Sequence, residues 1–318
     1  MFKKYILQVI IFILLIAIAW VLLLLRQPLP QKDNLATLNP VQPKPVQSGG
    51  DAIEQNLRPE YYPIRNWLVD EPEISAKSAI MVAFNNDEKE MVLYQKNSYQ
   101  QLPIASLTKI MTAVIALENL NPEDVIRVSK NSVMIDGDKG GLIIDENLSV
   151  KDLLYIMLIE SSNDAANALA NDNQKISFEE FVSLMNKKAK DLGLNNVHFE
   201  DPTGLSEKNQ STVRDLTKII KYSLNFPLLA EIIKTPQATI SSSDKKFVHN
   251  LINTNKLLGK IPVVLGGKTG FTQEAGGCMF ALSNINNHYL VTVILGSQSR
   301  EEDTEKLINW AQNGWLWK

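Results

Sequence analysis

The pattern of apolar and polar residues is typical of strands near both ends of the main part of the chain, and typical of helices between them. Short apolar runs that predict strands occupy residues 78–84, 90–95, 278–284 and 288–295. The first two are joined by a turn-like segment, as are the last two, so each pair predicts a hairpin. A fifth strand is expected to begin at Lys268, just after two glycines.

Apolar residues recur at helical spacing from about residue 106 to about residue 235, and a last helix is expected at about 301–313. These positions predict an α+β fold, in which both chain ends build a five-stranded antiparallel sheet flanked by helices. A helical subdomain would be inserted between the second and third strands. We expect the active site in the crevice between them, because pockets favour such interfaces.

The N-terminus carries an uncharged, apolar run of 21 residues, from Tyr5 to Leu25. A helix of that length spans roughly 30 Å, which is the thickness of a bilayer core. We interpret residues 1–26 as an uncleaved membrane anchor, residues 27–70 as a Pro- and Gln-rich linker, and residues 71–318 as the catalytic domain. The domain would lie on the extracytoplasmic side, since Lys3 and Lys4 favour a cytoplasmic N-terminus. A cleaved signal peptide and a buried core helix are the alternatives.

Composition removes several classes of function. The 318 residues have a formal net charge of −3, so no basic field indicates a nucleic-acid partner. A single cysteine, Cys278, permits no intrachain disulfide and is expected to be a small buried side chain. The three histidines, His198, His249 and His288, have no spacing typical of metal ligands, and we interpret them as structural or surface residues. No metal or cofactor is expected, and the sequence leaves the oligomeric state open.

Three short motifs occur in the order needed for an active-site serine. The first is Ser106-Leu107-Thr108-Lys109, at the start of a strongly periodic helix. A serine hydroxyl is a weak nucleophile unless a base takes its proton, and a lysine can do so only when its amine is neutral. Burial and a nearby positive charge, which Lys268 can supply, both disfavour the ammonium form. The alternative is that Ser106 is a plain helix N-cap.

The second motif, Ser161-Ser162-Asn163, lies between two helical patterns. Ser161 can relay a proton to the leaving amine, and Asn163 can hold Lys109 or the substrate backbone. Two caps at a helix junction are the alternative. The third motif is Lys268-Thr269-Gly270, where Lys268 and the Thr269 hydroxyl can bind a carboxylate. Gly270 lets a ligand approach closely, and a strand edge can pair with an extended peptide.

The chain resembles D-alanyl-D-alanine carboxypeptidases, the low-molecular-mass penicillin-binding proteins of the serine peptidase type, from about Ile74 to Gly296. The following stretches carry the resemblance: Ala105–Ala113, Phe199–Leu205, Ser211–Asp215, Lys268–Thr272 and Glu274–Cys278. The resemblance implies a β-lactamase/transpeptidase-like fold. It implies peptidoglycan stem peptides ending in D-Ala-D-Ala as substrate, and β-lactams as covalent inhibitors.

The resemblance also implies a role for each motif residue. Ser106 forms the acyl-enzyme, Lys109 is the general base, and Ser161 and Asn163 complete the relay. Lys268 and Thr269 bind the terminal carboxylate beside Gly270. Backbone N–H groups of Ser106 and Phe271 form the oxyanion hole. Two positions depart from the usual pattern, since Ser162 replaces a commoner glycine and Phe271 replaces a frequent histidine.

The sequence is compatible with other functions. A DD-endopeptidase or transpeptidase would share every motif. A serine β-lactamase would share the acylation residues, but no Glu-x-x-Leu-Asn lies between Asn163 and Lys268. A non-catalytic wall-binding module would be expected to have a broken motif set, whereas every key residue is present.

Overall fold

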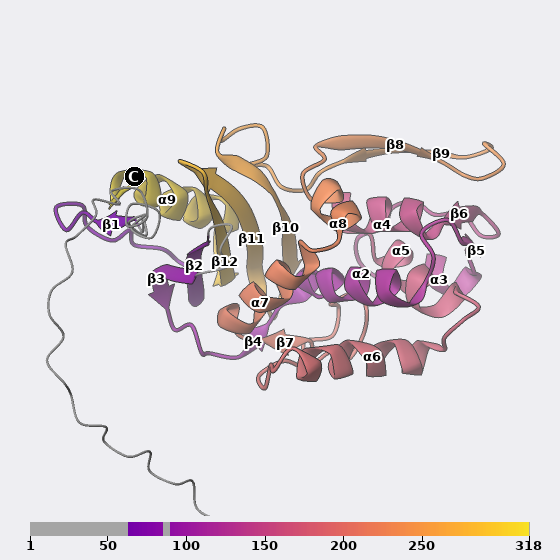
Figure 1. Cartoon of the computed structure of the whole chain (residues 1–318). Helices are drawn as coiled ribbons and strands as arrows, with labels where there is room; N and C mark the ends of the chain where they lie inside the picture. The colour runs from indigo at the N-terminus through magenta and orange to yellow at the C-terminus, as the bar shows by residue number, and fades with distance from the viewer. Residues whose placement is uncertain (1–62, 85–89, 318) are drawn as a thin grey trace, which may run out of the picture. The chain divides into compact units, whose positions relative to one another are not determined.

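The central element is a five-stranded antiparallel sheet, seen in a computed structural model that describes residues 63–84 and 90–317. The strand order is β10-β11-β12-β2-β3, so strands from the two chain ends lie side by side (Figure 1). The bounds are β2 Ser78–Phe84, β3 Glu90–Lys96, β10 Val264–Thr272, β11 Gly276–Ile285 and β12 His288–Ser297. The expected sheet is therefore confirmed, with β10 at one edge, although β10 begins at Val264 and not at the expected Lys268.

Alternating side chains of the sheet pack against two separate cores. Ile80 and Val82 of β2 join the larger core on the helical side, whereas Ala79 and Met81 join a smaller core on the opposite face. This is the period of two that a strand imposes on its side chains. The smaller core is covered by α9 (Arg300–Asn313), which matches the predicted last helix.

The chain between β3 and β10 forms the helical part of the fold (Figure 1). Its centre is α2 (Thr108–Asn119), whose first nine residues are all buried. The other α-helices of this part are α3 Lys130–Val133, α4 Val150–Ile159, α5 Asn163–Asn167, α6 Phe178–Asp191, α7 Val213–Ser223 and α8 Pro227–Ile232. A π-helical turn at Ala168–Asp172 continues α5. The inserted helical subdomain is thus confirmed.

The described residues also form four small two-stranded sheets, which were not predicted from the sequence pattern. They pair β1 (Ile64–Arg65) with β13 (Trp315–Leu316), β4 (Leu102–Pro103) with β7 (Gln210–Ser211), β5 (Val125–Arg127) with β6 (Asn147–Ser149), and β8 (Gln237–Ser241) with β9 (Val248–Ile252). Most are only two or three residues long, which is too short for a visible alternation. Because β1 pairs with the C-terminus, the folded part takes in the last residues of the segment assigned to a linker.

The apolar run 5–25 and most of the segment 27–70 lie outside the described residues. Among the residues that the structure does describe, no helix is both long enough and apolar enough to cross a membrane. The C-terminal tryptophans pack against the folded part. Trp310 and Trp315 are buried in the smaller core, with their rings edge to face and 6.0 Å between centroids.

Candidate active site

Ser106 lies in a single 3₁₀ turn, Ala105–Leu107, between β4 and α2. The N-cap position of α2 belongs to Leu107, and no side-chain cap bond is made there, so Ser106 is not a plain N-cap. The turn is tight. Ala105 has a left-handed φ of 46°, and a Cβ on Gly204 would lie 2.0 Å from the Ala105 carbonyl oxygen. A Cβ on Gly270 would lie 2.9 Å from the Ser106 nitrogen, so two glycines fix the nucleophile's backbone.

Lys109 is fully buried, and its Nζ has three oxygen partners. These are Ser106 Oγ at 2.9 Å, Asn163 Oδ1 at 2.7 Å and the carbonyl oxygen of Thr203 at 2.6 Å. Three acceptors suit an ammonium group. When the amine is neutral, its lone pair can instead accept the Ser106 hydroxyl proton. The expected contact between nucleophile and base is therefore present.

Burial lowers the pKa of Lys109 from 10.5 to about 7, although the carboxylates of Asp201, Asp138 and Asp164 oppose the shift. The main cause is thus desolvation rather than the charge of Lys268, which the sequence had offered as a contributor. The charge of Lys109, by contrast, does affect the pKa of Lys268. Burial is the first reason why the pKa of Lys268 falls well below its ordinary value, and the positive charges of Lys109 and Arg300 add to it.

The Ser161–Asn163 motif forms the sharp turn between α4 and α5. Ser161 is buried, and its left-handed φ of 64° lets the chain reverse between the two helices. Ser162 is the N-cap of α5, where its Oγ accepts from Ala165 N at 3.0 Å. The capping role therefore belongs to the middle residue. Asn163 is left to contact Lys109, and its Nδ2 donates to the Asp136 carbonyl oxygen at 2.9 Å.

The third motif lies on the edge strand β10, beside the turn that carries Ser106. Lys268 is buried and donates to the Thr269 carbonyl oxygen at 2.9 Å, while Thr269 Oγ1 is 2.6 Å from Thr254 Oγ1. Gly267 donates its N–H to the Ile233 carbonyl oxygen, outside the sheet, at 3.1 Å. Because N–H groups alternate along a strand, those of Thr269 and Phe271 face this same outer side.

Two contributors at the site were not identified from the sequence. Arg300, at the start of α9, donates from Nη1 to the Gly270 carbonyl oxygen at 2.9 Å. It brings a positive charge beside the third motif from a helix far along the chain. The residues around Arg300 in the sequence form no pattern that predicts this contact.

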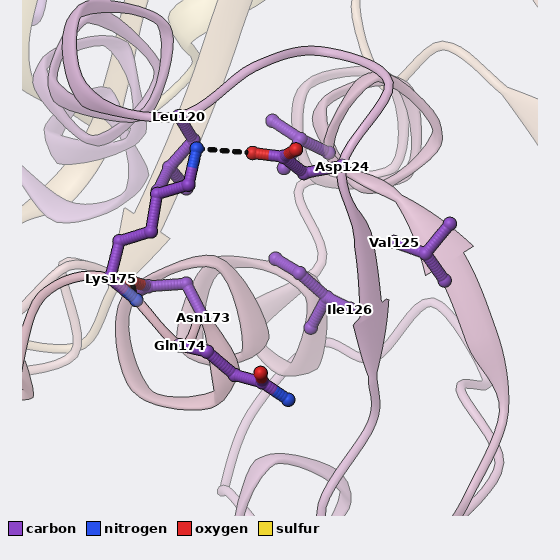
Figure 2. Close-up of a pocket in the computed structure, with 8 residues that line it drawn as sticks. Leu120, Asp124, Val125, Ile126, Asn173, Gln174 and Lys175 are labelled. Carbon is purple, nitrogen blue, oxygen red and sulfur yellow. Dashed lines mark hydrogen bonds and ion pairs between the residues drawn. The ribbon is translucent and has the colours of Figure 1, made fainter.

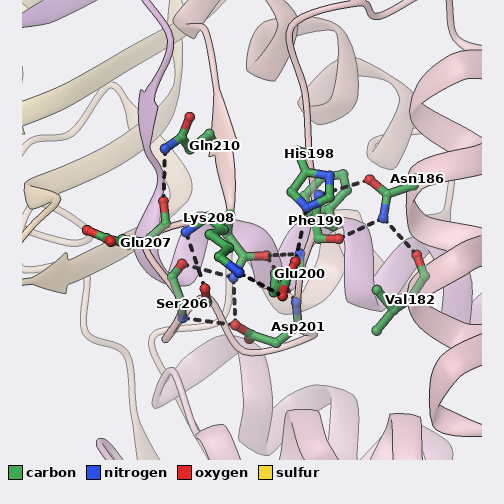
Figure 3. Close-up of polar contacts among 11 residues, drawn as sticks. Val182, Asn186, His198, Phe199, Glu200, Asp201, Ser206, Glu207, Lys208 and Gln210 are labelled. Carbon is green, nitrogen blue, oxygen red and sulfur yellow. Dashed lines mark hydrogen bonds and ion pairs between the residues drawn. The ribbon is translucent and has the colours of Figure 1, made fainter.

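The other contributor is the loop that supplies the Thr203 carbonyl oxygen. Figure 3 shows Asp201 and Ser206 of this loop, which are joined by a hydrogen bond. Asp201 organises the loop, accepting the N–H groups of Thr203, Gly204 and Ser206 at 2.7 to 2.9 Å, and Asn209 Nδ2 at 2.7 Å. Burial alone would raise the pKa of Asp201, but these hydrogen bonds outweigh it and lower the pKa. The turn-forming Asp-Pro-Thr-Gly sequence was the available signal.

A separate hollow lies beyond the C-terminal end of α2 (Figure 2). Its lining includes Leu120, Ile126 and Asn173, and an ion pair of 2.6 Å joins Lys175 Nζ to Asp124 Oδ2 beside it. None of the predicted site residues lines this hollow, so it is not the candidate active site.

Comparison with known proteins agrees with this geometry. The profile of the peptidase S11 family, described as D-alanyl-D-alanine carboxypeptidase, matches residues 66–299. The chain belongs to this family. It is therefore a serine hydrolase of the penicillin-binding type, which confirms the resemblance inferred from the motifs. The family consists of cell-wall enzymes that are periplasmic or associated with the membrane.

Individual relatives are named for three different reactions. The D-alanyl-D-alanine endopeptidase of Pseudomonas aeruginosa is 35% identical over 249 residues, which cover 76% of this chain and 79% of that protein. The D-alanyl-D-alanine carboxypeptidase DacF of Bacillus subtilis is 37% identical over 234 residues, covering 71% of this chain and 59% of that protein. The crystal structure of the Streptomyces K15 DD-transpeptidase superimposes with a TM-score of 0.71 at 31% identity, covering 76% of this chain and 98% of that one.

Proposed function

We propose that this protein removes the terminal D-Ala from peptidoglycan stem peptides ending in D-Ala-D-Ala, through an acyl-enzyme on Ser106. One observation carries the proposal above the others. The Ser106 hydroxyl lies 2.9 Å from the buried amine of Lys109, whose pKa is about 7. A serine and a base that is half neutral at pH 7 are what nucleophilic attack on an amide requires.

In acylation, the Ser106 oxygen attacks the carbonyl carbon of the penultimate D-Ala while its proton passes to the neutral Lys109 amine. The carbonyl oxygen becomes an oxyanion, for which the N–H groups of Ser106 and Phe271 are the proposed donors. When the intermediate collapses, the C–N bond breaks and the terminal D-Ala leaves as its amine. The proton for that nitrogen comes from Lys109 through the Ser161 hydroxyl.

We assign the terminal carboxylate of the substrate to the part of the site formed by the third motif, Lys268-Thr269-Gly270. Lys268 and the Thr269 hydroxyl are its proposed partners, and Arg300 adds positive charge beside Gly270. The outer edge of β10 then offers N–H and C=O groups to the extended peptide. Hydrolysis completes the cycle. Lys109 takes a proton from water, and the resulting hydroxide attacks the acyl carbon. The ester bond to Ser106 then breaks as Lys109 returns the proton to the Ser106 oxygen, across the 2.9 Å contact.

Penicillin tests the nucleophile directly, because its ring amide acylates the same serine. We expect intact-mass spectrometry of the purified protein to show one penicilloyl group, and peptide mapping to place it on Ser106. Ser106→Ala should abolish the adduct. Ser243→Ala is the matched control, since Ser243 and Lys246 repeat the Ser-x-x-Lys spacing at an exposed turn. An adduct that persists in Ser106→Ala would refute the assignment.

Endopeptidase cleavage of cross-linked peptides is the second candidate. It is supported by two relatives named D-alanyl-D-alanine endopeptidase, from Pseudomonas aeruginosa and Escherichia coli, of each of which the chain covers 79%. Purified pentapeptide and a purified D-Ala-linked dimer, offered at equal concentration, distinguish the two reactions. Faster cleavage of the dimer would make endopeptidase the main activity.

We further propose that residues 5–25 anchor the protein in the membrane and that residues 27–70 include a tether, with the catalytic domain on the extracytoplasmic side. The support is the 21-residue uncharged run, which exceeds the apolar length of a signal peptide. N-terminal sequencing of the mature protein tests this. A mature start near residue 30 would show that the run is cleaved.

A further inference from the structure

A buried histidine–glutamate pair lies near the site but has no part in the chemistry proposed above. His249 belongs to β9, and Glu146 precedes β6; their side chains are 7% and 0% exposed. His249 Nε2 is 2.8 Å from Glu146 Oε1, and Nδ1 is 3.2 Å from the Gly140 carbonyl oxygen. The histidine thus joins the β8–β9 hairpin to the loop that contains Gly140.

The partners of the His249 ring determine which of its nitrogens carries a hydrogen. A carbonyl oxygen only accepts, so Nδ1 must carry a hydrogen that it donates to Gly140. One further proton lies between Nε2 and the Glu146 carboxylate. Both ring nitrogens are therefore engaged, and the ring cannot rotate without leaving a buried polar group unpaired.

Gly140 has no room to move toward the site. A Cβ placed on it would lie 2.3 Å from Ile156 Cγ2 and 2.9 Å from Ser162 Oγ, so the Gly140 backbone packs directly on the second motif. Its N–H donates to Asp164 Oδ1 at 2.9 Å. His249 holds the carbonyl of the same residue, so Gly140 is fixed through both its N–H and its C=O.

The same loop also orients Asn163. The carbonyl oxygens of Asp136 and Asp138 accept from Asn163 Nδ2 at 2.9 Å and from Asn163 N at 2.8 Å. Asn163 in turn accepts from Lys109 at 2.7 Å. A continuous set of contacts therefore runs from His249, through the loop 136–142, to the base.

We propose that His249 is a positioning residue for acylation: by holding the Gly140 carbonyl, it fixes the loop that orients Asn163 and thereby keeps Lys109 in line with Ser106. This inference rests on the roles proposed above for Ser106 and Lys109. A small displacement of a positioned group can lower a rate by about 100-fold, so the effect is measurable.

Two substitutions separate the two hydrogen bonds of the ring. In His249→Asn the amide nitrogen lies near the position of Nδ1 and can still donate to Gly140. In His249→Gln it reaches the position of Nε2 and serves Glu146 instead. We expect His249→Asn to be acylated by a fluorescent penicillin within about threefold of the wild-type rate, and His249→Gln to be about 10- to 100-fold slower.

Stability should follow the opposite order, because the glutamine keeps the buried Glu146 carboxylate paired. Unfolding in urea gives that order, and acylation is measured where both variants are fully folded. Matched controls are His198→Asn and His198→Gln, since His198 forms an exposed pair with Glu200 at 3.2 Å. Both controls should acylate like the wild type.

Equal acylation by the two His249 variants, or rates that follow their stabilities, would overturn the proposal. If His249→Asn does not fold, Glu146→Gln provides the test, because it retains the Nδ1 bond to Gly140. It should acylate like the wild type, and a loss as large as that of His249→Gln would refute the positioning role. A wild-type protein that forms no adduct on Ser106 would instead refute the proposed function.

Discussion

The depressed pKa of Lys109 predicts a specific pH dependence of acylation. At the ordinary value of 10.5, about one amine in 3,000 would be neutral at pH 7, whereas at a pKa of about 7 half of the amines are neutral. This shift in pKa corresponds to a loss of about 5 kcal/mol in the stability of the ammonium form relative to the neutral amine. Between pH 6 and pH 8 the neutral fraction should rise from about one-eleventh to about ten-elevenths, so the rate of acylation should rise about tenfold.

The assay is the second-order rate constant for acylation by a fluorescent penicillin between pH 5 and pH 9. The rate should reach a plateau above pH 8. A rate that still rises tenfold per pH unit through pH 9 would refute the reasoning, because the amine would then keep its ordinary basicity.

One substitution moves the midpoint in a known direction. The exposed carboxylate of Asp138 raises the pKa of Lys109, so Asp138→Asn should lower it and shift the midpoint to lower pH. Asp136→Asn is the matched control on the same loop, since Asp136 is exposed and is not a cause of the shift. A midpoint that moves equally in both variants would show that the carboxylate of Asp138 is not responsible.

Three further predictions concern the surroundings of the site. Gly204→Ala should destabilise the protein by about 2 kcal/mol more than Gly193→Ala in urea unfolding, because both positions have positive φ but only a Cβ at Gly204 meets backbone, at 2.0 Å from Ala105 O; equal losses would contradict the close contact. Lys268→Ala should slow acylation by carboxylate-bearing substrates at least about 10-fold more than by decarboxylated analogues; equal slowing would show that carboxylate binding is not its main role. Cys278 should resist thiol reagents until the protein unfolds, because burial raises the pKa of its thiol to about 12; fast labelling of the folded protein would contradict this.

The sheet and the main helices could be predicted because their patterns are long. β11 and β12 have ten residues each and form almost continuous buried runs, and the first nine residues of α2 are all buried. The start of β10 at Val264 was missed, because three glycines interrupt its apolar pattern. The short pairs β4–β7 and β5–β6 could not be predicted, since their pairing depends on segments that meet only in the folded chain. In the β8–β9 hairpin, β8 alternates exposed and half-buried residues and β9 alternates exposed and buried ones. The strands include Gln, Ser, His and Asn, so the sequence shows no clear alternation of apolar and polar residues.

In the candidate site, too, contacts between residues close in the sequence were predictable, and contacts between distant segments were not. Ser106 and Lys109 were predictable as a contact because three residues bring two side chains onto one face of a helical turn. The contacts of the Thr203 carbonyl and the Arg300 guanidinium could not be predicted. The spacing of residues in the sequence shows neither the direction of a backbone carbonyl nor the approach of a residue distant in the chain. The cause of the Lys109 shift was also incompletely predicted, since burial and not the charge of Lys268 is its main source.

The most direct test of the central claim is the release of free D-Ala from a diacetyl-Lys-D-Ala-D-Ala peptide by the purified protein, followed over time beside Ser106→Ala and Ser243→Ala. We predict steady release by the wild type and by Ser243→Ala, no release by Ser106→Ala, and mass analysis that shows loss of one D-Ala per peptide. Release that continues in Ser106→Ala, or penicillin hydrolysis without any D-Ala release, would contradict the account.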